Sequence, residues 1–181
     1  MSKPEFSVRL ATLADVPTLE GLIADSARGL GRGDYTDAQI EAALGGTWGV
    51  DSELIRDGTY FVVEADGAVV ACGGWSRRQT LFGGDRHGAR SSALLDPERD
   101  AARIRAFFVR PEWARRGIGR ALLQRCEAEA RAHGFKRLGL MATLPGERLY
   151  AAAGFVVTGR EDHEMRPGVT IALIAMAKSL E

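Results

Sequence analysis

The sequence predicts a mixed α/β fold, in which a mostly antiparallel central sheet contains one parallel β-α-β crossover and carries helices on both faces. The first observation is a change of period, from helical stripes before residue 57 to β-rich runs after residue 59. The second is the segment 102–142, where an apolar run, an amphipathic stretch and another apolar run follow one another. Hairpin signals on either side of that unit indicate antiparallel neighbours.

The first part of the chain predicts one short strand and then helices. In chain order the ranges are a strand at 5–10, helices at 12–27 and 36–44, and one or two helical turns at 52–58. Thr12 and Asp15 resemble a capping box, and Thr36 stands where an N-cap residue is expected. These signals place the first two helix starts.

The rest of the chain predicts strands joined by two helices. The ranges are two β-rich runs within 59–78, strands at 102–109, 135–142, 155–161 and 168–179, and helices at 117–134 and 146–154. Asp66-Gly67 predicts a hairpin turn, and Gly134 the end of the longer helix. Residues 79–100 are polar, and a connection of that length is expected to be functional or mobile.

Size and charge exclude several classes of protein. The 181 residues predict a single domain, residues 1–181, with a core at about 6–178. The formal net charge is zero, which disfavours nucleic acid and anionic lipid as partners. The longest apolar run, VTIALIAMA, is too short to cross a bilayer, and the first residues contain no apolar signal segment. We therefore expect a cytoplasmic protein with no membrane partner.

The two cysteines predict neither a disulfide framework nor a metal site. Cys72 and Cys126 lie far apart and in different predicted elements. Buried, unreactive thiols and no bound metal are the expectation.

The stretch RPEWARRGIGRALLQRC, residues 110–126, predicts an anion site. Gly117 and Gly119 open a helix, where glycine costs about 1 kcal/mol relative to alanine. The first N–H groups of a helix lack internal partners and point out of its positive end, where a phosphate can bind if no Cβ blocks its approach. The alternative is a helix start that needs glycine for tight packing or a turn. The pattern matches neither a P-loop nor a dinucleotide-binding fingerprint.

The segment FFVRPEWARRGIGRALL resembles the acetyl-CoA signature of the GNAT family of N-acetyltransferases, whose core pattern is [Q/R]-x-x-G-x-[G/A]. The early stretch VRLATLADVPTLEGL is similar to the family's first strand and helix. ERLYAAAGF is similar to its late helix, where a tyrosine precedes a Gly-Phe pair by four residues. Two positions depart from the pattern: Ala114 replaces Gln or Arg, and Pro145 replaces a frequent asparagine.

The resemblance implies acetyl-CoA as co-substrate and a set of residues that bind it. The backbone of Phe107, Phe108 and Val109 would bind the pantetheine arm. The pyrophosphate would be held by Arg115, Arg116, Gly117, Ile118, Gly119 and Arg120. Tyr150 would lie near the CoA sulfur, where its phenol could protonate the departing thiolate.

The implied activity is transfer of an acetyl group to a primary amine by direct attack in a ternary complex. The acceptor is a small molecule or an exposed protein or peptide amine, and a homodimer is compatible with the family. A covalent acetyl-Cys72 route is a minor alternative, because nothing marks that thiol as activated. The main alternative is a non-catalytic acyl-CoA-binding or sensor domain of the same fold.

The sequence does not single out a general base or an acceptor site. The strand at 102–109 contains Arg103 and Arg105, on one side, and no acid; they are exposed to solvent or attract a carboxylate of the substrate. The base candidates by residue type are Glu64, His87, Asp100 and His163. Residues 28–34 and 77–92 are expected to flank the acceptor cleft, with Trp48, Trp75 and Phe82 as lining candidates, although core packing is the simpler interpretation of Trp75.

Overall fold

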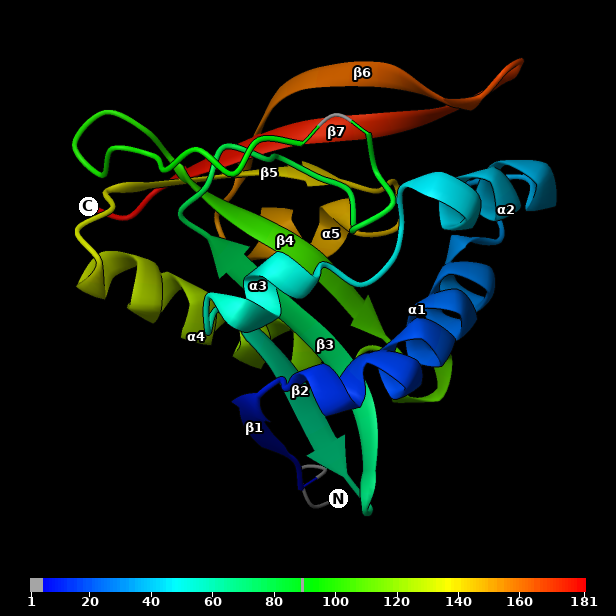
Figure 1. The fold of residues 1–181 in the computed structure, drawn as a ribbon, viewed down its shortest axis with the longest axis horizontal. Helices are drawn as coiled ribbons and strands as arrows, with labels where there is room; N and C mark the ends of the chain where they lie inside the picture. The colour runs from blue at the N-terminus through cyan, green and yellow to red at the C-terminus, as the bar shows by residue number, and fades with distance from the viewer. Residues whose placement is uncertain (1–4, 89) are drawn as a thin grey trace.

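In the computed structural model, which describes residues 5–88 and 90–181, seven strands form one sheet in the order β1-β2-β3-β4-β5-β7-β6 (Figure 1). Strands β4 and β5 run parallel, and every other neighbouring pair is antiparallel. The strands are β1 Ser7–Leu10, β2 Tyr60–Ala65, β3 Ala68–Ser76, β4 Ala102–Val109, β5 Arg137–Ala142, β6 Val156–Arg166 and β7 Val169–Ser179. The predicted mixed sheet with one parallel crossover is confirmed.

Helices cover both faces of this sheet, as predicted. They are α1 Val16–Gly31, α2 Asp37–Gly46, α3 Ser52–Arg56, α4 Ile118–Ala132 and α5 Glu147–Ala152, with 3-10 turns η1 Leu13–Asp15 and η2 Pro111–Trp113. In Figure 1, α1 and α3 lie in front of the sheet and α4 lies behind it. The crossover helix α4 connects the parallel strands β4 and β5.

Strand β2 shows why both faces need a helix layer. Phe61 and Val63 belong to the core cluster that contains the buried residues of α4. Tyr60 and Val62 point the other way, into the cluster formed with α1 and α3. All four side chains are fully buried. Because successive side chains of a strand point to opposite faces of the sheet, β2 is apolar on both faces.

The hairpin turn, the helix cap and the helix end that the sequence predicts have the expected geometry. Asp66 and Gly67 both have positive φ, 49° and 75°, the geometry of a tight hairpin turn between β2 and β3. Thr36 Oγ1 accepts a hydrogen bond from the Gln39 N–H group (3.2 Å) and caps α2. Gly134, with φ 87°, follows the end of α4. No helix in the described ranges is long and apolar enough to cross a membrane.

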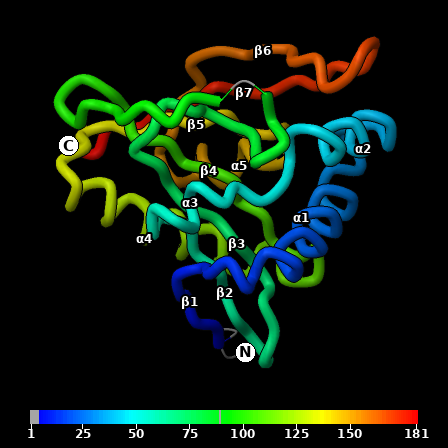
Figure 2. The backbone as a smooth tube through the Cα atoms, viewed as in Figure 1, coloured from blue at the N-terminus to red at the C-terminus, as the bar shows by residue number. Residues whose placement is uncertain are grey.

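The connection between β3 and β4, green in Figure 2, is held by hydrogen bonds on both sides of residue 89. It reaches β6, where the ring of Phe82 lies 4.8 Å from that of His163. Arg90 Nη1 donates to the carbonyl oxygens of Gly83 and Gly84, and Nη2 donates to Asp51 (2.9 Å). The loop is therefore anchored to the start of α3.

Of the two arginines of β4, Arg105 contradicts the prediction, because it is neither exposed nor a free cation that could face a substrate. Arg105 is 3% exposed, and its Nη2 forms an ion pair with Asp51 Oδ2 (2.8 Å). It also donates to the carbonyl oxygens of Thr80 and Gly83, so it supports the loop that passes over it. Arg103 is half-buried; its Nε atom is fully enclosed and has no hydrogen-bond partner among the described residues.

Candidate active site

Strand β4 contains a bulge just before its last residues. Phe108 opposes Cys72 and Arg105 opposes Gly74, so the single residue Gly73 faces both Ala106 and Phe107. Ala106 has φ 54°, a left-handed conformation that costs a non-glycine residue about 1–2 kcal/mol. Tyr60 Oη donates to the Ala106 carbonyl oxygen (2.8 Å) and holds the bulge in place.

Beyond its first residues, β4 separates from β5. The two strands pair at Ala102–Leu138 and Arg103–Gly139. From Ile104 to Val109 the β5-facing edge of β4 has no strand partner among the described residues, although β3 still pairs with the other edge. A strand edge with free N–H and C=O groups can bind an extended chain through main-chain hydrogen bonds.

Within the predicted pantetheine segment, the backbone groups of Val109 point to this open edge, whereas Phe108 pairs with Cys72 of β3. The Arg110 N–H group donates to Val70 of β3 (2.9 Å), so the groups of its neighbour Val109 point away from β3. The Val109 N–H group donates to Ser26 Oγ of α1 (3.2 Å). One of the expected backbone donors therefore already has a partner, and the Val109 carbonyl oxygen is left to face the opening.

The turn before α4 has the backbone shape of an anion site. Arg115 has φ 61° and Gly117, the N-cap residue, has φ 85°. Gly117 is exposed, and a Cβ added to it would meet no atom within 4 Å, so the space beside it is open. Alternation of left-handed and other residues turns successive N–H groups toward one point, and the helix dipole adds positive potential there.

Three arginines surround this turn without a carboxylate partner among the described residues: Arg115, Arg116 and Arg120. The Arg116 guanidinium lies 4.8 Å from the ring centroid of Trp113. Unpaired cations beside open amides fit a phosphate group, and so these residues fit the diphosphate of coenzyme A.

Gly119 serves a different purpose from Gly117. It lies inside α4, and a Cβ built there would lie 3.0 Å from Leu149 Cδ2 of α5. Tight packing, the alternative considered for this pair of glycines, therefore explains Gly119, while a left-handed backbone explains Gly117.

Tyr150 of α5 is buried beside the bulge. Its ring centroid lies 6.1 Å from that of Phe107 and 5.8 Å from that of Phe155. Burial raises the pKa of Tyr150 above its ordinary value, so the phenol keeps its proton at neutral pH. Its hydroxyl has no hydrogen-bond partner among the described residues, yet it is not fully enclosed, and so it reaches an accessible space.

The candidates for the general base differ in their hydrogen-bond partners and surroundings. Glu64 accepts a hydrogen bond from Arg9 (2.9 Å), and Asp100 accepts one from the Asp96 N–H group (2.7 Å). His163 lies 2.8 Å from Glu161. Burial, together with nearby Arg90 and Arg105, lowers the pKa of His87 and favours the neutral imidazole that a base requires.

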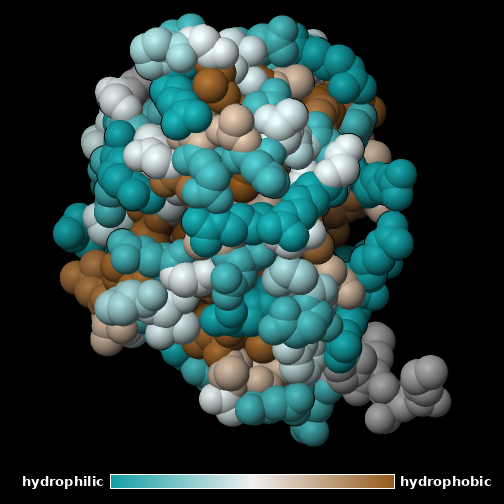
Figure 3. All heavy atoms as spheres, turned by 90° about the vertical axis from the view of Figure 1, so that its right-hand side faces the viewer, coloured by the Kyte–Doolittle hydropathy of each residue, from teal (hydrophilic) through white to brown (hydrophobic). Residues whose placement is uncertain are grey.

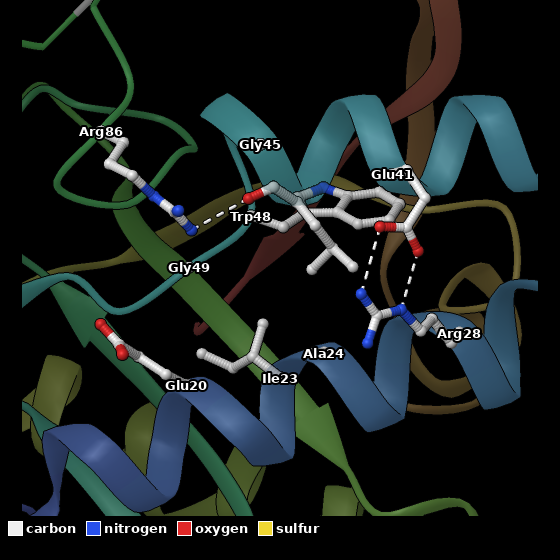
Figure 4. A pocket seen from close by; sticks show the side chains of 10 residues that line it. Glu20, Ile23, Ala24, Arg28, Glu41, Gly45, Trp48, Gly49 and Arg86 are labelled. Carbon is white, nitrogen blue, oxygen red and sulfur yellow. Dashed lines mark hydrogen bonds and ion pairs between the residues drawn. The ribbon is translucent and has the colours of Figure 1, made fainter.

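A second opening, which we call the α1–α2 crevice, lies between these two helices (Figure 4). It has a volume of about 350 Å³. Its lining residues are Glu20, Ile23, Ala24, Arg28, Glu41, Leu44, Gly45, Trp48, Gly49 and Arg86. Trp48 was expected to line a cleft and does so; Trp75 is fully buried and donates to Glu129 (3.0 Å), so it belongs to the core.

The sequence did not reveal Ser26, Tyr60, Glu20 or Arg86 as site residues. Tyr60 and Ser26 act on the backbone of β4 from elements far away in the chain. Glu20 and Arg86 are charged residues on an exposed helix face and a loop, and no local motif distinguishes them from other surface charges.

Comparison with known proteins agrees with this geometry. The sequence profile described as the acetyltransferase (GNAT) family matches residues 27–155. That range includes α2, the bulged strand β4, the turn before α4, and Tyr150. No curated protein sequence matches the chain.

Solved structures share the whole fold at low sequence identity. A GCN5-related N-acetyltransferase from Rhodopseudomonas palustris is 22% identical with a TM-score of 0.70, over 99% of this chain and 97% of that one. The PaiA N-acetyltransferase from Thermoplasma acidophilum in complex with coenzyme A is 16% identical, with a TM-score of 0.64 over 97% and 99%. YncA, a putative acetyltransferase from Salmonella typhimurium with acetyl-CoA, is 20% identical, with a TM-score of 0.63 over 97% and 94%.

Proposed function

Since the chain belongs to the acetyltransferase (GNAT) family, which uses acetyl-CoA as co-substrate, we propose that it transfers the acetyl group to a primary amine by direct attack in a ternary complex. The observation that carries this proposal is the position of the open β4 edge. It leads directly, through Arg110 and η2, into the turn that opens α4. One continuous stretch of chain thus offers backbone groups for an amide-containing arm and N–H groups for a diphosphate.

Each part of the proposed site has a distinct binding role. The N–H groups from Gly117 to Arg120 hold the diphosphate, and Arg115 and Arg116 add charge around it. The free edge of Phe107–Val109 aligns the pantetheine arm. When bound there, acetyl-CoA supplies an acetyl group activated as a thioester.

The reaction forms an N–C bond and breaks a C–S bond. The amine must be neutral to attack, and His87 is one candidate for the base, since its lowered pKa favours the neutral imidazole. A main-chain N–H group next to the bulge stabilises the charge that develops on the acetyl oxygen. Tyr150 gives its proton to the departing sulfur, for which a buried, protonated phenol is suited.

A covalent route through Cys72 has no support in the geometry. The thiol is fully buried on β3, and burial raises its pKa to about 12. At neutral pH the nucleophilic thiolate is therefore nearly absent. Cys126 is equally buried within α4, and burial raises its pKa too.

Two measurements test the function and separate it from the acyl-CoA sensor alternative. Acetyl-CoA at a hundredfold excess over Kd is expected to stabilise the folded state by about 2.7 kcal/mol, measured as a thermal shift. Absence of a thermal shift at millimolar acetyl-CoA would contradict both the transferase function and the acyl-CoA sensor alternative. Release of free CoA thiol in the presence of amines supports catalysis. A thermal shift without thiol release in the presence of any amine would support the acyl-CoA sensor alternative.

The role of the left-handed glycine can be tested with a matched pair of variants. Gly117→Ala and Gly58→Ala each place a Cβ at positive φ, 85° and 71°, in open space, at a cost of about 1–2 kcal/mol in unfolding free energy. Only Gly117→Ala is expected to weaken acetyl-CoA binding, by at least about tenfold, because it disturbs the amide turn that binds phosphate. Calorimetric titration checks this, and equal affinities in the two variants would place the diphosphate elsewhere.

A further inference from the structure

Resting on the proposed function, we propose that the α1–α2 crevice binds the acceptor, and that the acceptor is a small amine that also carries a carboxylate, as an amino acid does. The helices α1 and α2 place the crevice on the side of the sheet opposite to α4. Helix α1 packs on β3 and β4, and α2 packs on β6 and β7. The space between them therefore lies over the part of the sheet that contains β4 and β5, and Figure 4 shows β4 passing behind it.

The crevice is suited to a small molecule. Its volume of about 350 Å³ lies at the lower end of the roughly 300–1,000 Å³ found for ligand pockets. Ile23 and the indole of Trp48 form an apolar part between charged ends (Figure 4). The right-hand side of the molecule in Figure 1 carries many hydrophilic residues, with smaller hydrophobic areas between them (Figure 3).

Charge distribution indicates the chemistry of this ligand. Arg28 and Glu41 form a two-point ion pair, at 2.7 and 3.1 Å, and neutralise each other. Glu20 and Arg86 form no ion pair with any described residue. Arg86 Nη2 donates to the Leu44 carbonyl oxygen (2.9 Å), which orients the guanidinium and leaves its other donors available.

An unpaired cation and an unpaired anion on the same crevice complement a zwitterion. Arg86 provides a planar donor group for a carboxylate. The Glu20 carboxylate attracts the ammonium form of the amine. The side chain of the acceptor then lies on Ile23 and Trp48. An alkylamine without a carboxylate would use Glu20 and the apolar residues but not Arg86. A ligand with two negative charges would be repelled by the Glu20 carboxylate.

The test compares each acceptor with its uncharged relatives. The compounds are L-phenylalanine, L-phenylalaninamide and phenethylamine, with the corresponding leucine series. Arg86→Gln is expected to raise KM for the two amino acids at least about tenfold, the effect of losing one charge-assisted hydrogen bond, and to leave the amides and amines unchanged. Glu20→Gln is expected to raise KM for all six compounds. Each KM value of a variant is divided by the wild-type KM for the same compound. Differences in amine basicity between the compounds therefore cancel.

Arg99→Gln serves as the matched control, because this side chain is 85% exposed and lies outside the crevice. It is expected to change no KM. Equal effects of Arg86→Gln on acids and amides, or wild-type kinetics in that variant, would overturn the proposed carboxylate contact while leaving acetyl transfer intact.

A binding measurement separates failure of this inference from failure of the function. Calorimetric titration of L-phenylalanine and L-leucine into CoA-saturated protein is expected to show binding that Arg86→Gln weakens by the same factor as it raises KM. Absence of binding and of thiol release with amino acids, together with release from other amines, contradicts the inference alone. Absence of release with every amine overturns the proposed transfer and this acceptor together.

Discussion

Replacement of Tyr150 with phenylalanine is expected to lower kcat at least about tenfold, toward the factor of about 10²–10⁴ that general acid catalysis contributes, with little change in CoA affinity. The phenol is held beside Phe107 of the bulge, and burial keeps it protonated. Phenylalanine retains the ring contacts with Phe107 and Phe155 and removes only the proton donor. Steady-state kinetics with thiol detection measures the effect.

A change of leaving group distinguishes an acid from a packing residue. Acetyl thioesters of more acidic thiols need less help at the sulfur, so the defect of Tyr150→Phe is expected to shrink with them. A defect of constant size across thioesters, or a normal kcat with acetyl-CoA, would dismiss Tyr150 as the proton donor.

Replacement of Asp51 with alanine is expected to lower the free energy of unfolding by about 3–5 kcal/mol, the cost of leaving a buried charge without its partner. Asp51 and Arg105 are 1% and 3% exposed, and Asp51 also accepts hydrogen bonds from Arg90 and from the start of α3. The variant therefore loses the anchor between β4, α3 and the β3–β4 loop. Denaturant unfolding gives the value.

Two further variants make that prediction specific. Asp25→Ala removes an exposed partner of Arg110, whose ion pair is worth at most about 1 kcal/mol. The double variant Asp51→Ala/Arg105→Met is expected to recover part of the stability, since it no longer buries an unpaired cation. A cost for Asp51→Ala as small as that for Asp25→Ala would contradict the account of Arg105.

Most of the fold could be predicted because its signals are local. The change from helical to strand period, the hairpin at Asp66-Gly67 and the cap at Thr36 each depend on a few adjacent residues, and each appears in the structure. The same holds for the buried cysteines and for the helix that begins after Gly117. The positions of the predicted CoA residues follow from these elements.

The errors concern contacts between distant parts of the chain. Arg105 looked like a free cation because its partner Asp51 lies 54 residues away, and burial of a charge cannot be read from a strand pattern. The bulge at Ala106 has no sequence signal, since the residue that holds it, Tyr60, lies 46 positions earlier. Glu20 and Arg86 are far apart in the chain and line the same crevice only because α1 and the β3–β4 loop both border it.

The central claim is that the turn before α4 and the open edge of β4 together bind coenzyme A. A crystal structure with CoA tests it most directly. The claim predicts diphosphate oxygens at about 2.7–3.2 Å from N–H groups between Gly117 and Arg120, and the pantetheine arm beside Phe107–Val109. A diphosphate bound at any other place on the protein would contradict it.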